Sequence, residues 1–244
     1  MSSLSGKIAL VTGASRGIGA SVARMLADRG ADIVINYHSK ASRAENAAAD
    51  VHAVGRRALL AQADLTKADE VTAMIEAVRR EYGRLDVLVL NASGGLEKNK
   101  PADYAMQLNL TAQVMLVDTA IPLMPRGGRI VFVTSHMAHF HGERPIGGPY
   151  EPVAASKYAG EQALWARSTE FANRGIGFVV VSGDMIEGTI TPKLLERMNK
   201  GTIESRRSQA GALPTIEEFA RAIADAASCA EIDSPTIFVG STQQ

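Results

Sequence analysis

The stretch Thr12-Gly13-Ala14-Ser15-Arg16-Gly17-Ile18-Gly19 decides the fold, because it joins an apolar run at residues 8–12 to a segment of helical spacing at residues 20–29. Glycine permits a tight turn and a close approach of the backbone to a ligand. The unpaired amides at a helix start favour an anion such as pyrophosphate. A glycine triplet can be an ordinary turn, but its position between a strand and a helix at the start of the chain favours a dinucleotide-binding loop.

Short apolar runs alternate with helical segments, such as residues 70–82, along the rest of the chain. These runs lie at residues 8–12, 33–36, 58–62, 87–90, 130–134, 178–182 and 237–239. Continuous apolar strands separated by helices indicate a parallel sheet with helices on both faces. The sequence therefore predicts an α/β class, a doubly wound Rossmann fold of about seven strands, with its ligand beyond the carboxyl ends of the strands.

Composition limits the classes of function. The 244 residues are 46% hydrophobic and 21% charged, enough for one sizeable core, and no linker or repeat divides residues 1–244, so we expect a single domain. The 26 basic residues balance the 26 acidic ones, which disfavours nucleic-acid and membrane partners. Cys229 is the only cysteine and is expected to pack within a helix. With no apolar signal region or membrane-length run, the protein is expected in the cytoplasm.

At this point the chain resembles the short-chain dehydrogenase/reductase family, in its single-domain form, over nearly its whole length. The glycine stretch matches the family's T-G-x-x-x-G-x-G motif, and Asn91-Ala92-Ser93-Gly94 resembles its N-N-A-G turn with two replacements. Asp64-Leu65 resembles the pair that contacts adenine, although Asp64 could instead cap the following helix. The resemblance implies these cofactor-binding residues: Gly13, Ser15, Arg16, Gly17, Ile18, Gly19, Tyr37, His38, Ser39, Asp64, Leu65, Asn91, Ala92, Ser93, Lys157, Gly183 and Thr189.

The end of the second predicted strand favours NADP (NADPH) over NAD. Tyr37 stands where NAD-specific members of the family place an aspartate, and an aspartate there would repel a 2′-phosphate. Arg16, with Lys40 or Arg43, could pair with that phosphate. The alternative is that these cations are solvated surface charges.

The catalytic residues of the family are present with one exception. The resemblance implies that Ser135 positions a substrate carbonyl, that Lys157 binds the nicotinamide ribose, and that Asn109 takes part in holding a water of the proton relay. The family's proton-donating tyrosine precedes the lysine by four residues, and that position holds Val153, which cannot donate a proton. Taken singly, the three matching residues could be a turn former, a solvated charge and a core polar group.

Tyr150 is the leading candidate for the missing acid. It precedes Lys157 by seven residues, about 10.5 Å along a continuous helix, which is one turn too far. Pro152 suggests that the helix begins there, which leaves Tyr150 in a loop that can fold back. Alternatively, Tyr150 only packs at the helix entrance, as part of a substrate wall or subunit contact.

Histidine is the second candidate, because His136, His139 and His141 follow the fifth predicted strand and histidine titrates near neutral pH. Three histidines could also hold a metal, but Glu143 is the only further ligand nearby, so we expect no metal site.

Beyond the sixth predicted strand, Ser182-Gly183-Asp184 replaces the family's Pro-Gly, and the resemblance places Gly183 and Thr189 at the nicotinamide carboxamide or the pyrophosphate. A helical substrate lid is expected within residues 184–212. Its apolar surface would come from Met185, Leu194, Leu195 and Met198.

The sequence therefore predicts an NADPH-dependent oxidoreductase that reduces a ketone or related C=X group of a small, partly hydrophobic molecule, with an atypical proton donor. The alternative is a catalytically lapsed NADP-binding sensor or assembly protein. The resemblance also implies a homotetramer or homodimer.

Overall fold

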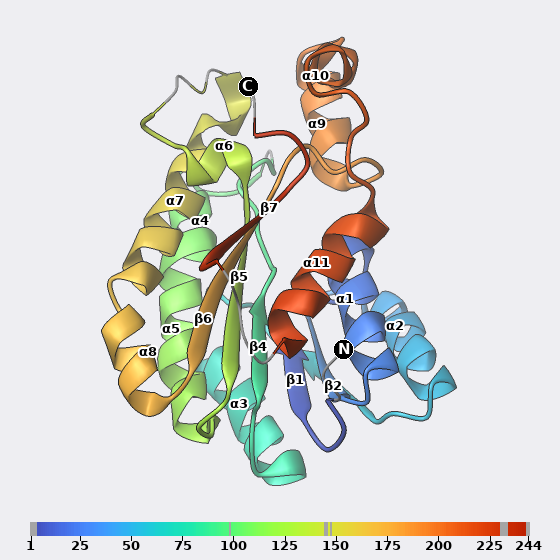
Figure 1. The fold of residues 1–244 in the computed structure, drawn as a ribbon, viewed down its shortest axis with the longest axis vertical. Helices are drawn as coiled ribbons and strands as arrows, with labels where there is room; N and C mark the ends of the chain where they lie inside the picture. Colours follow the sequence, from blue (N-terminus) through green and yellow to red (C-terminus); the bar gives the residue numbers. More distant parts are fainter. Residues whose placement is uncertain (1–3, 98, 144–145, 147, 230–233, 243–244) are drawn as a thin grey trace.

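The computed structural model describes residues 4–97, 99–143, 146, 148–229 and 234–242, and these residues form the predicted doubly wound α/β fold. Seven parallel strands make one sheet in the order β3-β2-β1-β4-β5-β6-β7 (Figure 1). The strands are β1 (Ile8–Val11), β2 (Asp32–Tyr37), β3 (Ala58–Gln62), β4 (Val87–Leu90), β5 (Arg129–Ser135), β6 (Gly177–Gly183) and β7 (Thr236–Val239). The strand order reverses between β1 and β4, which is where folds of this class bind their ligands.

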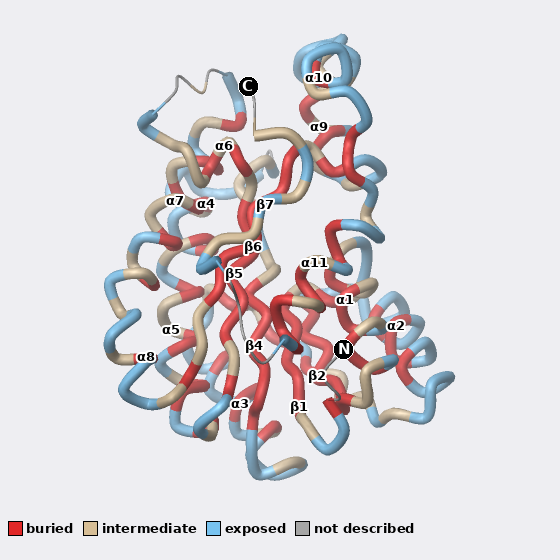
Figure 2. The backbone as a smooth tube through the Cα atoms, viewed as in Figure 1, coloured by how far each residue is buried: buried red, intermediate tan, exposed pale blue. Residues whose placement is uncertain are grey.

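Helices cover both faces of the sheet (Figure 1). One face carries α1 (Gly17–Asp28), α2 (Ala41–Ala53) and α11 (Ile216–Ser228), and the other carries α3 (Ala68–Tyr82), α5 (Ala112–Ala120), α7 (Glu151–Trp165) and α8 (Ser168–Arg174). Alternate strand residues enter the two layers: Ala9 and Val11 pack under α1, whereas Ile8 and Leu10 face the other core. Figure 2 shows that the central strands are buried along their length.

The remaining elements are short and lie in the connections between the strands and the longer helices. They are α4 (Tyr104–Met106), η1 (Gln107–Thr111), η2 (Ile121–Leu123), α6 (His136–His139), η3 (Gly148–Tyr150), α9 (Ile190–Met198) and α10 (Thr202–Ala210). The helices α9 and α10 stand beyond the carboxyl edge of the sheet (Figure 1). None of the helices in the described part of the chain combines the length and the hydrophobicity that crossing a membrane requires.

Some predicted boundaries and environments were wrong. The first helix begins at Gly17 rather than near Ala20, so it includes the last glycines of the loop. Helix α7 begins at Glu151, and Tyr150 belongs to a single 3₁₀ turn rather than to an open loop. Cys229 does not pack within a helix: it follows the last residue of α11 and is exposed.

Helix α5 continues from α4 through a π-helical turn, η1, which the sequence did not predict. This turn carries Asn109, and its carbonyl oxygen closely approaches Gly160 on α7. A Cβ atom at position 160 would collide with that oxygen. The absence of a side chain at Gly160 therefore fixes how closely α7 approaches η1.

Replacing Gly160 with alanine is expected to force these two helices apart. Overpacking of this kind lowers the free energy of unfolding by about 1–3 kcal/mol. The measurement is chemical denaturation of Gly160→Ala beside Gln162→Ala, which changes an exposed residue of the same helix. Equal stability of the two variants would contradict the close contact.

Candidate active site

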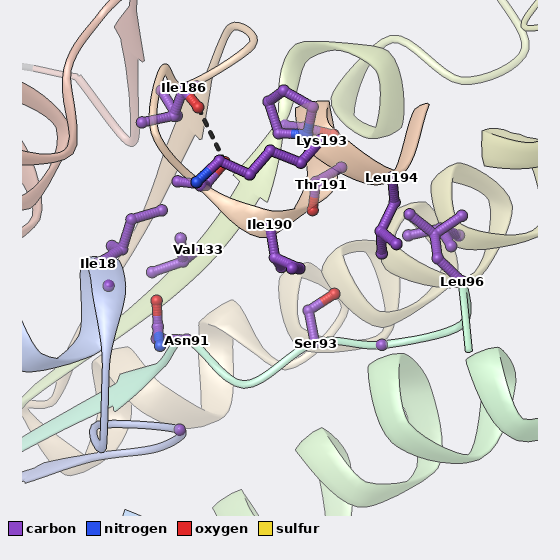
Figure 3. Close-up of a pocket in the computed structure, with 18 of the residues that line it drawn as sticks. Ile18, Asn91, Ser93, Leu96, Val133, Ile186, Ile190, Thr191, Lys193 and Leu194 are labelled. Atoms are coloured by element: carbon purple, nitrogen blue, oxygen red, sulfur yellow. Dashed lines mark hydrogen bonds between the residues drawn. The ribbon is translucent and has the colours of Figure 1, made fainter. Parts of the chain in front are cut away.

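A cleft of about 1280 Å³ lies at the carboxyl edge of the sheet, between the strand ends and the helices α9 and α10. Every residue predicted to bind the cofactor lines this cleft, as do Ser135 and Tyr150. In Figure 3, Ile18 of the glycine loop and Asn91 after β4 lie across the cleft from Ile190 and Lys193 of α9. The structure thus brings together side chains that are far apart in the sequence.

The glycine loop has the backbone geometry of an anion-binding turn. Gly13 and Gly17 have φ of 62° and 55°, in the left-handed region that favours glycine. A Cβ atom on Gly19 would lie 2.6 Å from the Gly13 carbonyl oxygen, so the loop closes this tightly only with glycine. No side chain caps the start of α1, where Arg16 is the N-cap residue. The first amides of this helix remain available to a pyrophosphate.

Two residues that sequence reasoning missed hold the loops around this turn. The Asn36 Oδ1 accepts a hydrogen bond from the Gly13 amide at 3.2 Å, and its Nδ2 donates to the carbonyl oxygens of Ala61 in β3 and Ala63 just after it. The Gln113 Nε2 donates to the Ala92 carbonyl at 3.2 Å. The signal for Asn36 was a polar residue inside an otherwise apolar, buried strand.

The turn after β4 is tied to the end of β1. The Thr12 hydroxyl accepts from the amides of Asn91 at 2.8 Å and Ala92 at 2.9 Å, and it donates to the Val89 carbonyl. The Asn91 Nδ2 donates to the Thr12 carbonyl at 2.8 Å. These bonds fix the floor of the cleft at the point where the strand order reverses.

At the end of the cleft beyond β2 and β3, basic and polar side chains meet. Arg16, Lys40 and Arg43 all line this part of the cleft. Asp64 lies 3.6 Å from His38 and does not cap α3, because its Oδ1 accepts hydrogen bonds from the amide and hydroxyl of Thr66. Burial raises the pKa of the Asp64 carboxyl, but these hydrogen bonds outweigh it and hold the pKa below its usual value. Asp64 is therefore an ionised acceptor at neutral pH.

Tyr150 is the residue that reaches Ser135. Their hydroxyl oxygens are 3.0 Å apart, although Tyr150 comes from the 3₁₀ turn before α7 and Ser135 from the end of β5. The Tyr150 side chain is buried, and burial raises its pKa against the opposing effect of the hydrogen bond to Ser135. Tyr150 therefore carries its phenolic proton at neutral pH.

Val153 occupies the wall of the cleft one helical turn before Lys157. It is buried and packs in one apolar cluster with Tyr150. Its side chain closely faces Gly95, where a Cβ atom would lie 3.0 Å from the valine methyl group. The position that holds the tyrosine in other family members is thus filled by packed hydrocarbon.

Lys157 lines the cleft from the same face of α7 and is buried. Burial lowers the pKa of its ammonium group to about 8, while the charge of Glu161 acts in the opposite direction.

Asn109, in contrast, is not among the residues that line the cleft. Both of its amide hydrogens are engaged, by the Gly94 carbonyl at 2.9 Å and by the Ser156 hydroxyl at 3.0 Å. Its side chain braces the turn after β4 against α7, and its part in a proton relay stays a prediction.

The three histidines point to three different partners. His136 alone lines the cleft, where its Nδ1 lies 2.8 Å from the Ser182 hydroxyl, and burial lowers its pKa to about 4. At neutral pH His136 is therefore uncharged. His139 pairs with Glu161 at 2.6 Å and His141 with Glu151 at 2.9 Å. Within the described ranges, no group of three potential ligands could hold a metal ion.

Apolar side chains surround the Ser135–Tyr150 pair. Leu96, Met137, Met185 and Leu195 line the cleft and pack in the cluster that contains Tyr150 and Val153. Leu194 also lines the cleft, as Figure 3 shows. The expectation for Met198 was wrong: its side chain is 52% exposed and is not among the residues lining the cleft, because it lies at the last turn of α9.

A buried ion pair fastens α10 to the sheet. Asp184 follows β6, and its carboxylate accepts hydrogen bonds at 2.7 and 2.8 Å from the guanidinium of Arg206. Arg206 also donates to the Ser241 carbonyl at 2.8 Å. Asp184, which directly follows the Ser182-Gly183 pair at the end of β6, therefore anchors one wall of the cleft.

Removing the cation by Arg206→Met is expected to loosen α10, because it leaves Asp184 buried without its counterion, at a cost of about 3–5 kcal/mol. Hydrogen exchange of the α10 amides should become faster. The matched control is Arg207→Met, whose partners Glu187 and Glu204 are exposed, for which a loss of at most about 1 kcal/mol is expected. Equal exchange in the two variants would show that the buried pair does not anchor the helix.

Comparison with known proteins agrees with this geometry. The model of the family described as short chain dehydrogenase matches residues 7–199. The chain belongs to that family, as the sequence predicted. A hydroxynaphthalene reductase of Aspergillus fumigatus is 37% identical over 181 residues, which cover 70% of this chain and 63% of that protein. The chain spans only between 55% and 63% of the curated hydroxynaphthalene reductases that it matches.

Two solved structures extend the comparison to the whole chain. A short chain dehydrogenase from Burkholderia cenocepacia in complex with NADP has a TM-score of 0.85 at 29% identity and covers 98% of both chains. An angucycline C-6 ketoreductase with bound NADP has a TM-score of 0.78 at 28% identity and covers 98% of this chain and 95% of the other. The prediction of NADP as the cofactor agrees with what these two relatives hold.

Proposed function

We propose that the protein is an NADPH-dependent reductase of a ketone or related C=X group, with Tyr150 as the proton donor. The observation that carries this proposal is the 3.0 Å distance between the hydroxyls of Ser135 and Tyr150 inside the cleft that Lys157 also lines. At this distance a serine hydroxyl and a protonated phenol lie side by side, although the position that usually holds the tyrosine is occupied by Val153. When bound, NADPH supplies the hydride.

The residues of the cleft suit that cofactor. The amides at the start of α1 and the glycine loop would hold the pyrophosphate, and the ammonium group of Lys157 would hold the nicotinamide ribose. Arg16, Lys40 and Arg43 would bind the 2′-phosphate, since a guanidinium pairs with phosphate in two hydrogen bonds.

The chemistry required of the protein is the stabilisation of a developing alkoxide. Ser135 would donate a hydrogen bond to the substrate oxygen, and Tyr150 would transfer its phenolic proton to that oxygen as the carbon receives hydride. The raised pKa of Tyr150 keeps this proton in place until the reaction. Tyr150 must then regain a proton from solvent before the next turnover.

The apolar residues that line the cleft favour a substrate with a large hydrophobic surface. Leu96, Met137, Met185 and Leu195 surround the hydroxyl pair. Two relatives are named as a hydroxynaphthalene reductase and an angucycline C-6 ketoreductase, and naphthalene is a fused aromatic ring system. We therefore propose a fused-ring aromatic ketone as the substrate class, and the α9–α10 segment within residues 184–212 as the lid over it.

Val153 favours a second candidate, a cofactor-binding protein that has lost its chemistry and acts as a sensor or assembly partner. Stereospecific turnover of any ketone would exclude it. The expected homodimer or homotetramer also belongs to the proposal. The shallow groove on η1 and α5 that the half-buried Leu110, Val114 and Met115 line supports such an association, which sedimentation would test. Cell fractionation would test the proposed cytoplasmic location.

Replacing Tyr150 with phenylalanine removes the phenolic proton and keeps the ring. We expect kcat for a fused-ring ketone to fall by about 10²–10⁴-fold, which is the usual contribution of general acid catalysis. NADPH affinity, measured by the fluorescence of the bound nicotinamide, should stay within about twofold. Tyr158→Phe on α7 is the control, and an unchanged kcat in Tyr150→Phe would show that another group donates the proton.

Replacing Arg16 with alanine is expected to weaken NADPH binding about tenfold, because one charged hydrogen-bonding partner of the phosphate is lost. NADH binding should change little, since NADH lacks the 2′-phosphate. The same comparison with Lys40→Ala and Arg43→Ala identifies the second partner. Arg24→Ala on the exposed side of α1 is the control, and parallel losses for both cofactors would argue against a 2′-phosphate contact.

A further inference from the structure

A carboxylate with no assigned role is buried directly behind Lys157. Glu161 follows Lys157 by one helical turn on the same face of α7, and its residue is 0% exposed. Its Oε1 lies 2.6 Å from the Nδ1 of His139. Its Oε2 is buried and has no hydrogen-bond partner among the described residues. A buried carboxylate with one unsatisfied oxygen is costly, so this arrangement needs a compensating interaction.

Besides His139, the cation that can act on this carboxylate is Lys157, one helical turn before it on the same buried face of α7. The carboxylate of Glu161 raises the pKa of the Lys157 ammonium group against the larger effect of burial. On the other side of Lys157 along this helix face stands Val153, which carries no charge. The lysine therefore has an apolar neighbour one turn before it and an anionic neighbour one turn after it.

The other charged groups around α7 are committed elsewhere or are neutral. On α7 and the elements packed against it, the titratable and charged groups are Tyr104, Asp118, Arg129, His136, His139, Tyr150, Glu151, Lys157, Tyr158 and Glu161. The carboxylate of Asp118 pairs with Arg167 at 2.7 Å, and that of Glu151 pairs with His141 at 2.9 Å. Among these groups, Glu161 is the carboxylate that is fully buried one helical turn from Lys157 and that keeps one oxygen without a hydrogen-bond partner.

Aromatic packing holds His139 in the orientation in which its Nδ1 contacts Glu161. Its ring packs edge-on against Phe140 and Phe238, with ring centroids 4.9 and 5.1 Å apart. Its side chain is 19% exposed, whereas that of Glu161 is 1% exposed. The histidine thus connects a fully buried carboxylate to the protein surface and restricts its rotamer.

We propose that Glu161, oriented by His139, is the positioning residue that keeps Lys157 protonated at neutral pH. This rests on the proposed function of Lys157 in binding the nicotinamide ribose. With the tyrosine position occupied by valine, Lys157 has lost its usual hydroxyl neighbour, and Glu161 places a buried carboxylate one helical turn further along the same face of α7. Neither residue touches the reacting atoms.

The chain contains a matched control for this pair. His141 and Glu151 also join the segment after β5 to α7, but Glu151 has a side-chain exposure of 44% and lies in the first turn of the helix. Glu161→Gln and Glu151→Gln each remove one carboxylate from a histidine–glutamate contact between the same two segments. Only the former should alter Lys157.

The first measurement is an NMR titration of the whole protein labelled with ¹³C at lysine Cε, with the Lys157 signal assigned by its loss in Lys157→Met. Removing the anion disfavours the charged lysine, so the titration midpoint of Lys157, about 8 in the parent protein, should fall in Glu161→Gln. The expected fall is about one pH unit or more. The alkaline loss of NADPH binding should move to lower pH by the same amount, and Glu151→Gln should leave both unchanged.

An unchanged Lys157 midpoint in a folded Glu161→Gln variant would overturn the proposal and leave the pair as a packing contact. If that variant does not fold, His139→Gln provides the second test. A smaller fall in the Lys157 midpoint is expected there, and an unchanged midpoint would overturn the proposal. The titration needs no substrate. A parent protein that reduces no ketone but shows the shift would refute the proposed function and support the role of Glu161.

Discussion

The parallel direction of all seven strands is the constraint on which the site depends, because it places every carboxyl end at one edge of the sheet. Residues at or just beyond the ends of β1 to β6 line the cleft, including Gly13 after β1, Asn91 after β4 and Ser135 at the end of β5. Hydrogen bonds that cross between these loops, such as those of the Thr12 hydroxyl, hold them in fixed relative positions. Each loop contributes its own side chains, and the parallel sheet brings the loops close together.

Within that frame, the start of α7 determines which side chain meets Ser135. The helix begins at Glu151, and a single 3₁₀ turn before it directs Tyr150 toward the strand end. Val153 then packs as hydrocarbon against the turn after β4, and Lys157 keeps its place on the cleft. Tyr150, three residues before Val153 in the sequence, thus reaches Ser135 from the turn before the helix, whereas motif spacing places a tyrosine at position 153 itself.

The fold and most of the cleft could be predicted from the sequence because strand and helix periodicity and the glycine motif are local signals. The contact of Tyr150 with Ser135 was predicted only as one of two alternatives, since it depends on where a helix begins. The braces formed by Asn36 and Gln113 and the burial of Glu161 were missed, because each depends on partners distant in the sequence. Cys229 and Met198 were misplaced because apolar character alone does not fix burial at a helix end.

The contact between Gly160 and the Asn109 carbonyl has a consequence for how such a cleft can change over evolution. Because nothing larger than hydrogen fits at that point, the spacing between α7 and the π turn is set by one backbone contact. The same turn carries the Asn109 side chain that braces Gly94 at the rim of the cleft. A single added methyl group at position 160, which does not line the cleft, would displace this turn and the Asn109 brace with it, so the rim of the cleft can change without a substitution among the residues that line it.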